Sequence, residues 1–128
     1  MKLLLDTHAL IWWFAGNPKI SQELRNQLND PKVEVFVSGA TAWELATKFR
    51  IGKLDVCEAF VRNLPNHLQS HGFLPLPVTV SHGLQAGLLD QAHKDPFDRM
   101  LAAQAIVEHL TLVTVDPCFV DFCVDTLW

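Results

Sequence analysis

The sequence predicts an α/β fold with a mainly parallel sheet of four to five short strands, flanked by helices. Short apolar runs, such as the Lys-Leu-Leu-Leu of residues 2–5, alternate with longer segments of helical pattern along the chain. Turn-forming residues stand at the junctions, at Gly16-Asn17-Pro18, Asp30-Pro31 and Asp116-Pro117. Strands separated by helices in this rhythm favour a layered fold, because each helix returns the chain to a parallel neighbour.

The first half of the chain contains two strands and three helices. Residues 2–5 form a buried strand, and residues 7–15 form a helix with three adjacent aromatic side chains. Residues 21–28 follow as an amphipathic helix. Residues 33–38 have the β-branched and aromatic composition of a second parallel strand, and residues 41–51 form the third helix.

The second half continues with three helical segments and three strands. The helical segments are residues 56–71, 81–92 and 96–109, and the strands are residues 73–77, 112–115 and 126–128. Pro65 predicts a bend within the first of these helices. Pro75 and Pro77 limit their strand to an edge of the sheet, because proline cannot donate a hydrogen bond to a neighbouring strand.

Length and composition indicate one compact soluble domain over residues 1–128. Of the side chains, 49% are hydrophobic and 19% are charged, which is enough apolar surface to bury a core. Asp6 and His8 interrupt the apolar start of the chain, so we expect a cytoplasmic protein without a signal peptide or membrane span. The three cysteines include no CxxC pair and fit reduced thiols better than disulfides or a zinc site.

Four acidic residues stand where such a sheet gathers its strand ends. Asp6 ends the first strand and Asp116 the fourth, while Glu44 and Asp98 lie in the first turns of two helices. Ligands of these sheets bind at the carboxyl ends of the strands, so the four side chains can converge. Carboxylates this close raise one another's pKa, and a divalent cation keeps them ionised. Oxygen ligands with open water positions point to Mg²⁺ or Mn²⁺.

Each acid also has a purely structural interpretation, in which it caps a helix. Thr41 and Glu44 match a capping box, in which Glu44 bonds back to the backbone at Thr41. Asp95 precedes a proline and resembles an N-cap, with Asp98 at the third helical position. The same capping position is open to Asp6 and Asp116. Capping explains each acid singly, whereas four acids at matching ends favour a shared site, and both interpretations stay open.

Five groups of residues spread along the chain carry a resemblance to a known family. They are Leu-Leu-Asp-Thr-His at 4–8, Trp-Glu-Leu at 43–45 with Ser38 and Lys48, Asp-Pro-Phe-Asp-Arg at 95–99 with Ala-Ala-Gln-Ala at 102–105, Thr-Val-Asp at 114–116, and Val-Asp-Thr-Leu-Trp at 124–128. With these motifs the chain resembles the PIN-domain ribonucleases, and among them the VapC toxins of bacterial toxin–antitoxin operons. The resemblance covers residues 3–128, and its most specific part is the motif at 95–99.

This resemblance implies a three-layer PIN-like fold and a Mg²⁺- or Mn²⁺-dependent endoribonuclease that acts on structured RNA. It also implies a small antitoxin protein as partner. It assigns Asp6 and Asp98 as metal ligands, and Glu44 and Asp116 as ligands that bind directly or through water. Three further residues are expected around the ligands. Thr7 and Thr114 either orient the ligands or serve only as ordinary caps, and Asp95 caps its helix.

Two other functions stay open at this point. A different metal-dependent phosphoryl hydrolase also places acids at strand ends, and a non-catalytic binding module can keep the same acidic pocket. Against the hydrolase, the first strand is not followed by an Asp-x-Asp pair.

Binding of RNA requires clustered cations, because the net charge of −4 gives no general affinity for nucleic acid. Half of the 10 lysine and arginine residues lie in segments beside the expected site: Lys48, Arg50, Lys53, Lys94 and Arg99. We expect them to follow the RNA phosphates. Alternatively, these cations form a solvated helix face without a ligand, and Arg99 forms an ion pair with an acidic side chain.

The three aromatic residues of the first helix point to a partner surface. Trp12, Trp13 and Phe14 are adjacent, so they cannot all face inward. At least one should be half-exposed, which suits contact with an antitoxin helix or with a second copy in a homodimer. His93 lies near the acids and is expected either to meet substrate or to pack. Two further large aromatic residues are expected in the core: Trp43 and Trp128.

Overall fold

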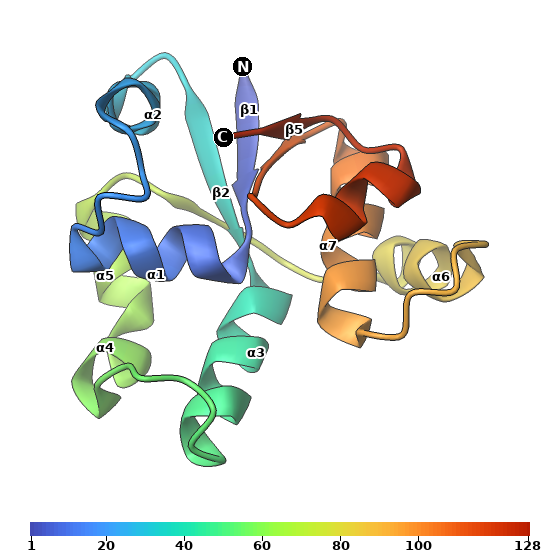
Figure 1. Ribbon diagram of the computed structural model, residues 1–128, viewed down its shortest axis with the longest axis horizontal. Helices are drawn as coiled ribbons and strands as arrows, with labels where there is room; N and C mark the ends of the chain where they lie inside the picture. Colours follow the sequence, from blue (N-terminus) through green and yellow to red (C-terminus); the bar gives the residue numbers. More distant parts are fainter.

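A computed structural model describes residues 1–128, and its centre is a five-stranded sheet in which every neighbouring pair of strands is parallel (Figure 1). The strands lie in the order β3-β2-β1-β4-β5, so β1 is central. Their bounds are β1 Lys2–Leu5, β2 Glu34–Ser38, β3 Leu74–Leu76, β4 Thr111–Val113 and β5 Thr126–Leu127. The predicted α/β fold with a parallel sheet is confirmed.

Helices cover both faces of this sheet and complete three layers. Their bounds are α1 Thr7–Ala15, α2 Gln22–Asn29, α3 Gly39–Arg50, α4 Glu58–Arg62, α5 Leu64–Ser70, α6 Val80–Leu88, α7 Pro96–Glu108 and the 3₁₀ helix η1 Pro117–Phe122. In Figure 1, α1, α2, α4 and α5 lie to one side of the sheet, and α6 and α7 lie to the other. None of the helices combines the length and the apolar character needed to span a bilayer.

Consecutive side chains of β1 point to opposite faces and so belong to two different cores. Leu3 and Leu5 join the core under α1, α2 and α5, whereas Leu4 packs with residues of α7 and η1. All three leucines are fully buried. Because both faces of β1 are covered, its sequence is a continuous apolar run rather than an alternating one.

Helix α7 lies close to the sheet through small side chains. Ala102, Ala103 and Ala105 are all buried, and Leu101 packs beside them against Leu4 of the central strand. A helix anchored in this way holds its first turn at a fixed place on the sheet edge. The acidic end of α7 is therefore positioned by the core behind it.

Two helix boundaries differ from the sequence expectation, and each has a local cause. Helix α3 begins at Gly39 because the Ser38 hydroxyl accepts a hydrogen bond from the backbone N–H of Ala40 at 2.9 Å. Helix α6 ends at Leu88, and residues 89–95 form a loop whose carbonyls are bound by an arginine described below. The bent helical region before β3 is two helices, α4 and α5.

The three aromatic residues of α1 differ in their surroundings. Trp13 is 8% exposed and packs on Phe73 with ring centroids 5.7 Å apart, so it cannot contact a partner, contrary to the expectation. Trp12 is half-buried and lies edge-on to Trp128 at 5.6 Å. Phe14 is also half-buried. The expected partner patch is therefore reduced to Trp12 and Phe14.

Trp43 is on the surface, which corrects the expectation of a core residue. Its side chain on α3 is 61% exposed. One edge packs against Phe97 of α7, with ring centroids 4.7 Å apart. Trp128 is likewise partly outside the core, at 39% exposure. Both residues cover an edge of the fold rather than fill its interior.

Candidate functional site

The four acidic side chains that the sequence analysis singled out line one cleft at the carboxyl end of the sheet. They are Asp6 after β1, Glu44 on α3, Asp98 on α7 and Asp116 after β4. Strands β1 and β4 are parallel neighbours, so their carboxyl ends meet at the same edge. The cleft has a volume of about 390 Å³, and its other polar lining residues are Thr7, His8, Lys48 and Asp95.

Asp6 is a buried carboxylate that serves both the fold and the cleft. It is 8% exposed, and its Oδ1 accepts a hydrogen bond from the backbone N–H of Ala9 at 2.8 Å, which caps α1. Burial raises the pKa of the Asp6 carboxyl above its ordinary value of 3.8, and the nearby Asp98 raises it further. Hydrogen bonds from Thr114 and Ala9 lower this pKa but do not cancel the effect of burial.

Glu44 is held in the cleft by two side chains. The Thr7 hydroxyl donates to its Oε1 at 2.5 Å, and the Lys48 ammonium pairs with its Oε2. The capping box does not form, because Ser38 is the N-cap of α3 and the buried Thr41 hydroxyl has no hydrogen-bond partner. Glu44 thus lines the cleft and does not cap α3, although it is only 5% exposed.

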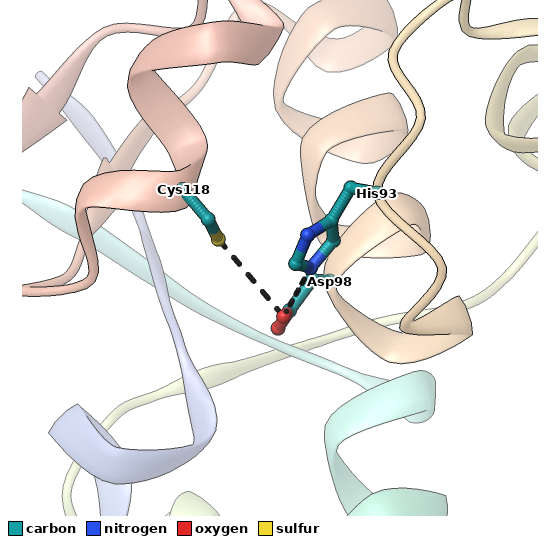
Figure 2. Close-up of side chains that lie close together, drawn as sticks. All are labelled: His93, Asp98 and Cys118. Carbon is teal, nitrogen blue, oxygen red and sulfur yellow. Dashed lines mark hydrogen bonds and ion pairs between the residues drawn. The ribbon is translucent and has the colours of Figure 1, made fainter.

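Asp98 meets the cleft from the first turn of α7, and Figure 2 shows two side chains directed at its carboxylate. The imidazole Nε2 of His93 donates to Oδ2 at 2.9 Å, and Sγ of Cys118 lies 4.0 Å from the same oxygen. Burial raises the pKa of the Asp98 carboxyl, and the charges of Asp95 and Glu44 raise it further. The hydrogen bond from His93 lowers it and leaves a net increase.

Asp95 and Asp116 are both helix caps. The Oδ1 of Asp95 accepts a hydrogen bond from the backbone N–H of Phe97 at 2.9 Å. Asp95 is the N-cap of α7, as its position directly before a proline predicts. The Oδ1 of Asp116 accepts from the N–H of Cys118 at 2.9 Å and begins η1. The backbone N–H of Asp116 donates to the Thr114 hydroxyl at 3.0 Å. Thr114 therefore helps to fix the backbone at the acid that follows β4.

Arg99 does not line the cleft, and its guanidinium has a different task from the expected contact with phosphate or an acid. A guanidinium has five N–H donors. All of them donate to backbone carbonyls at the end of α6 and in the loop before α7, at 2.7 to 3.5 Å. The carbonyls belong to Ala86, Gly87, Leu89, Gln91 and His93. Arg99 therefore shapes the loop that carries His93 toward Asp98.

Among the five cations expected to follow RNA, Lys48 is the one that lines the cleft. Arg50, Lys53 and Lys94 are exposed and lie outside the lining. Burial lowers the pKa of the Lys48 ammonium, but its hydrogen bond to Glu44 and the surrounding carboxylates outweigh that effect and raise the pKa. Lys48 therefore carries its charge into an otherwise acidic cleft.

His93 and Cys118 contact Asp98 but were not predicted as site residues from the sequence. Each lies close in sequence to a predicted acid, since His93 is in the loop before Asp98 and Cys118 follows Asp116 directly after a proline. That proximity is the signal that could have identified them. This proximity in sequence indicates a shared site only once the fold is known to place α7 and η1 side by side.

Asp6→Asn is expected to stabilise the protein in EDTA at neutral pH. Asparagine keeps the cap on α1. Because the folded-state pKa of Asp6 is raised, the folded state retains its proton to higher pH than the unfolded state. The free energy of unfolding of the natural chain therefore falls as pH rises from about 3.8 through the folded-state pKa, and the asparagine variant escapes this loss.

The measurement is the melting temperature of both chains in EDTA between pH 3 and pH 8. The variant should gain several degrees at the neutral end, and the gain should shrink to nothing toward the acidic end. Asp55→Asn, at an exposed carboxylate away from the cleft, is the control and should change little at any pH. An equal difference at both ends of the range would show that burial of the charge is not its cause.

Comparisons with known proteins found a matching family, a relative in sequence and similar folds. A family model described as PIN domain matches residues 3–124. Ribonuclease VapC16 of Mycobacterium tuberculosis is 33% identical over 60 residues, which are 47% of this chain and 43% of that protein, so the match spans less than half of the relative.

Two solved structures have a similar fold. VapBC2 from Rickettsia felis, bound to a DNA fragment from its promoter, matches with a TM-score of 0.74 and 18% identity, covering 99% of this chain and 98% of that one. VapBC-1 from nontypeable Haemophilus influenzae matches with a TM-score of 0.72 and 22% identity, covering 99% and 97%. At these identities the likeness establishes the fold.

Proposed function

We propose that this chain, which belongs to the PIN-domain family, is a metal-dependent endoribonuclease and the toxin of a toxin–antitoxin pair, with residues 1–128 as one nuclease domain. The observation that carries the proposal is the convergence of Asp6, Glu44, Asp98 and Asp116 in one cleft. The likeness to Ribonuclease VapC16 supports RNA as the substrate.

The donor set of the cleft fits a divalent cation. Four carboxylates supply only oxygen ligands, and burial raises the pKa of two of them, Asp6 and Asp98. Clustered carboxylates of this kind suit a hard ion such as Mg²⁺ or Mn²⁺. Asp6 and Asp98 would hold it directly, and Glu44 and Asp116 directly or through water. When bound, the ion supplies Lewis acidity toward a phosphate oxygen and lowers the pKa of a coordinated water.

The chain's own residues prepare this site in three ways. The Thr7 hydroxyl donates to one oxygen of Glu44, and the Thr114 hydroxyl accepts from the backbone N–H of Asp116, so two hydroxyls help to position two acids. Lys48 brings a positive charge to the cleft wall, where it can attract a substrate phosphate. Asp95 caps α7 and fixes its first turn.

The proposal includes two protein partners, a small antitoxin and a second copy of the chain. The solved structures of similar fold are VapBC complexes, which supports an antitoxin partner. For the second copy, α6 presents an apolar stripe of Val80, Leu84 and Leu88, which are 82%, 62% and 78% exposed. Residues spaced four apart lie on one helix face, and an exposed apolar stripe is typical of a protein interface.

The purified protein tests the proposal when it is incubated with structured RNA in Mg²⁺, in Mn²⁺ and in EDTA. Internal cleavage of RNA is expected with either ion and none with EDTA. A phosphomonoester serves as a second substrate and should remain intact. Hydrolysis of the monoester without RNA cleavage would favour a different phosphoryl hydrolase, and binding of RNA without cleavage under all conditions would favour a non-catalytic module.

A further inference from the structure

We infer that His93, Asp98 and Cys118 form a second metal site, selective for Zn²⁺ over Mg²⁺, and that Zn²⁺ bound there withdraws Asp98 from the acidic cleft. The three residues come from the loop before α7, from α7 itself and from η1 (Figure 2). The spacing of the cysteines in the sequence gave no indication of zinc. The site arises because the fold brings one thiol to a histidine and a carboxylate.

The donor atoms are already within reach of one ion. The ligand atoms of the three side chains all lie within 4.8 Å of one another. In tetrahedral zinc sites, bond lengths of about 2.0 to 2.3 Å place neighbouring ligand atoms roughly 3.3 to 3.6 Å apart. The His93 to Asp98 distance of 2.9 Å and the Cys118 to Asp98 distance of 4.0 Å lie on either side of these values. The remaining pair, His93 and Cys118, lies within 4.8 Å, so side-chain shifts of up to roughly 1 Å complete three corners of a tetrahedron.

Each ligand is held by its own surroundings. The His93 ring lies edge-on to Phe122 with centroids 5.7 Å apart, and its backbone carbonyl accepts from Arg99 at 3.0 Å. The backbone of Cys118 is fixed by its hydrogen bond to Asp116 at 2.9 Å. A metal site whose ligands are positioned before binding needs little rearrangement. The contacts of His93 and Cys118 are thus part of the fold and do not depend on a metal.

The ligand types decide which ion is preferred. Imidazole and thiolate suit Zn²⁺ and bind Mg²⁺ poorly, whereas the four carboxylates of the cleft suit Mg²⁺. Zn²⁺ replaces the hydrogen bond between His93 and Asp98, since Nε2 binds a metal only in the tautomer that carries the ring proton on Nδ1. Coordination also deprotonates the Cys118 thiol, so each Zn²⁺ that binds forms one S–Zn bond and releases one proton to water.

Cobalt reports on this site directly, because a thiolate–Co²⁺ bond absorbs in the near ultraviolet and Co²⁺ replaces Zn²⁺ in tetrahedral sites. The natural chain should bind Co²⁺ with this absorption and lose it when Zn²⁺ is added. Cys118→Ser should abolish the absorption, and His93→Gln should weaken Zn²⁺ binding about tenfold or more. Cys123→Ser, at an exposed cysteine at the end of the same 3₁₀ helix, is the matched control and should behave as the natural chain.

The effect on cleavage rests on the proposed function and is measured separately. Zn²⁺ added to a reaction in Mg²⁺ should inhibit RNA cleavage, and Cys118→Ser should require about tenfold more Zn²⁺ for the same inhibition. Thiolate absorption that persists in Cys118→Ser, or no absorption in the natural chain, overturns the metal site whatever the activity. Absorption as expected in a protein that does not cleave RNA leaves the metal site standing and overturns the proposed function instead.

Discussion

Asp98→Asn is expected to reduce metal-dependent RNA cleavage more than about a hundredfold while thermal unfolding stays cooperative. Changes to residues that only support a metal ligand already cost about 10- to 100-fold in activity or metal affinity, so loss of a direct ligand should cost more. Asparagine has nearly the same shape as aspartate, but it lacks the charge that holds a divalent cation. The loss therefore reports on the carboxylate and not on the fold.

The stability of this variant separates a site residue from a structural one. Asp98 does not cap α7, since that role belongs to Asp95. Burial and the charges of Asp95 and Glu44 disfavour the ionised form of Asp98. In EDTA the variant should therefore melt at the same temperature as the natural chain or above it.

Cleavage rates and melting curves of the same preparations provide the measurement. Asp121→Asn, at an exposed acid on η1, is the control and should keep full activity. If folded Asp98→Asn kept full activity, the acidic cleft would not be the site of RNA cleavage.

The convergence of the acids could be predicted because it follows from chain topology. In a parallel sheet all strands deliver their following residues to the same edge, so Asp6 and Asp116 must lie near each other once β1 and β4 are neighbours. The choice between cap and site was harder, since local sequence is the same for both. In the structure Asp6 caps α1 and also lines the cleft, while Glu44 lines the cleft without capping, because Ser38 starts α3 earlier.

The task of Arg99 could not be predicted, because its partners are backbone carbonyls. Carbonyl groups are present at every residue, so no side-chain pattern marks the five that Arg99 binds. The exposure of Trp43 has a similar origin. Its surroundings depend on how α3 and α7 pack at Phe97, and helical periodicity within α3 carries no information about that contact.

The structure nevertheless makes the importance of Arg99 measurable. Its guanidinium satisfies carbonyls at the end of α6, where a helix leaves its last carbonyl groups unpaired, and in the loop up to His93. Hydrogen bonds to a charged group contribute about 1.5 to 3 kcal/mol each, and losing several together costs less than their sum when water replaces some of them. The loop before α7 should therefore lose its conformation without this side chain.

Arg99→Met is expected to lower the free energy of unfolding by about 3 kcal/mol, and Arg99→Lys by about half as much, because an ammonium has three donors and no planar fork. Denaturant midpoints measure both. Arg62→Met, at an exposed arginine paired with Glu58, is the matched control and should change stability by less than about 1 kcal/mol. His93 belongs to the loop that Arg99 holds, and it is one of the proposed Zn²⁺ ligands. Arg99→Met should therefore also weaken Zn²⁺ binding at fixed pH. A variant with natural stability would mean that water replaces the guanidinium at little cost, and that the loop holds its shape without Arg99.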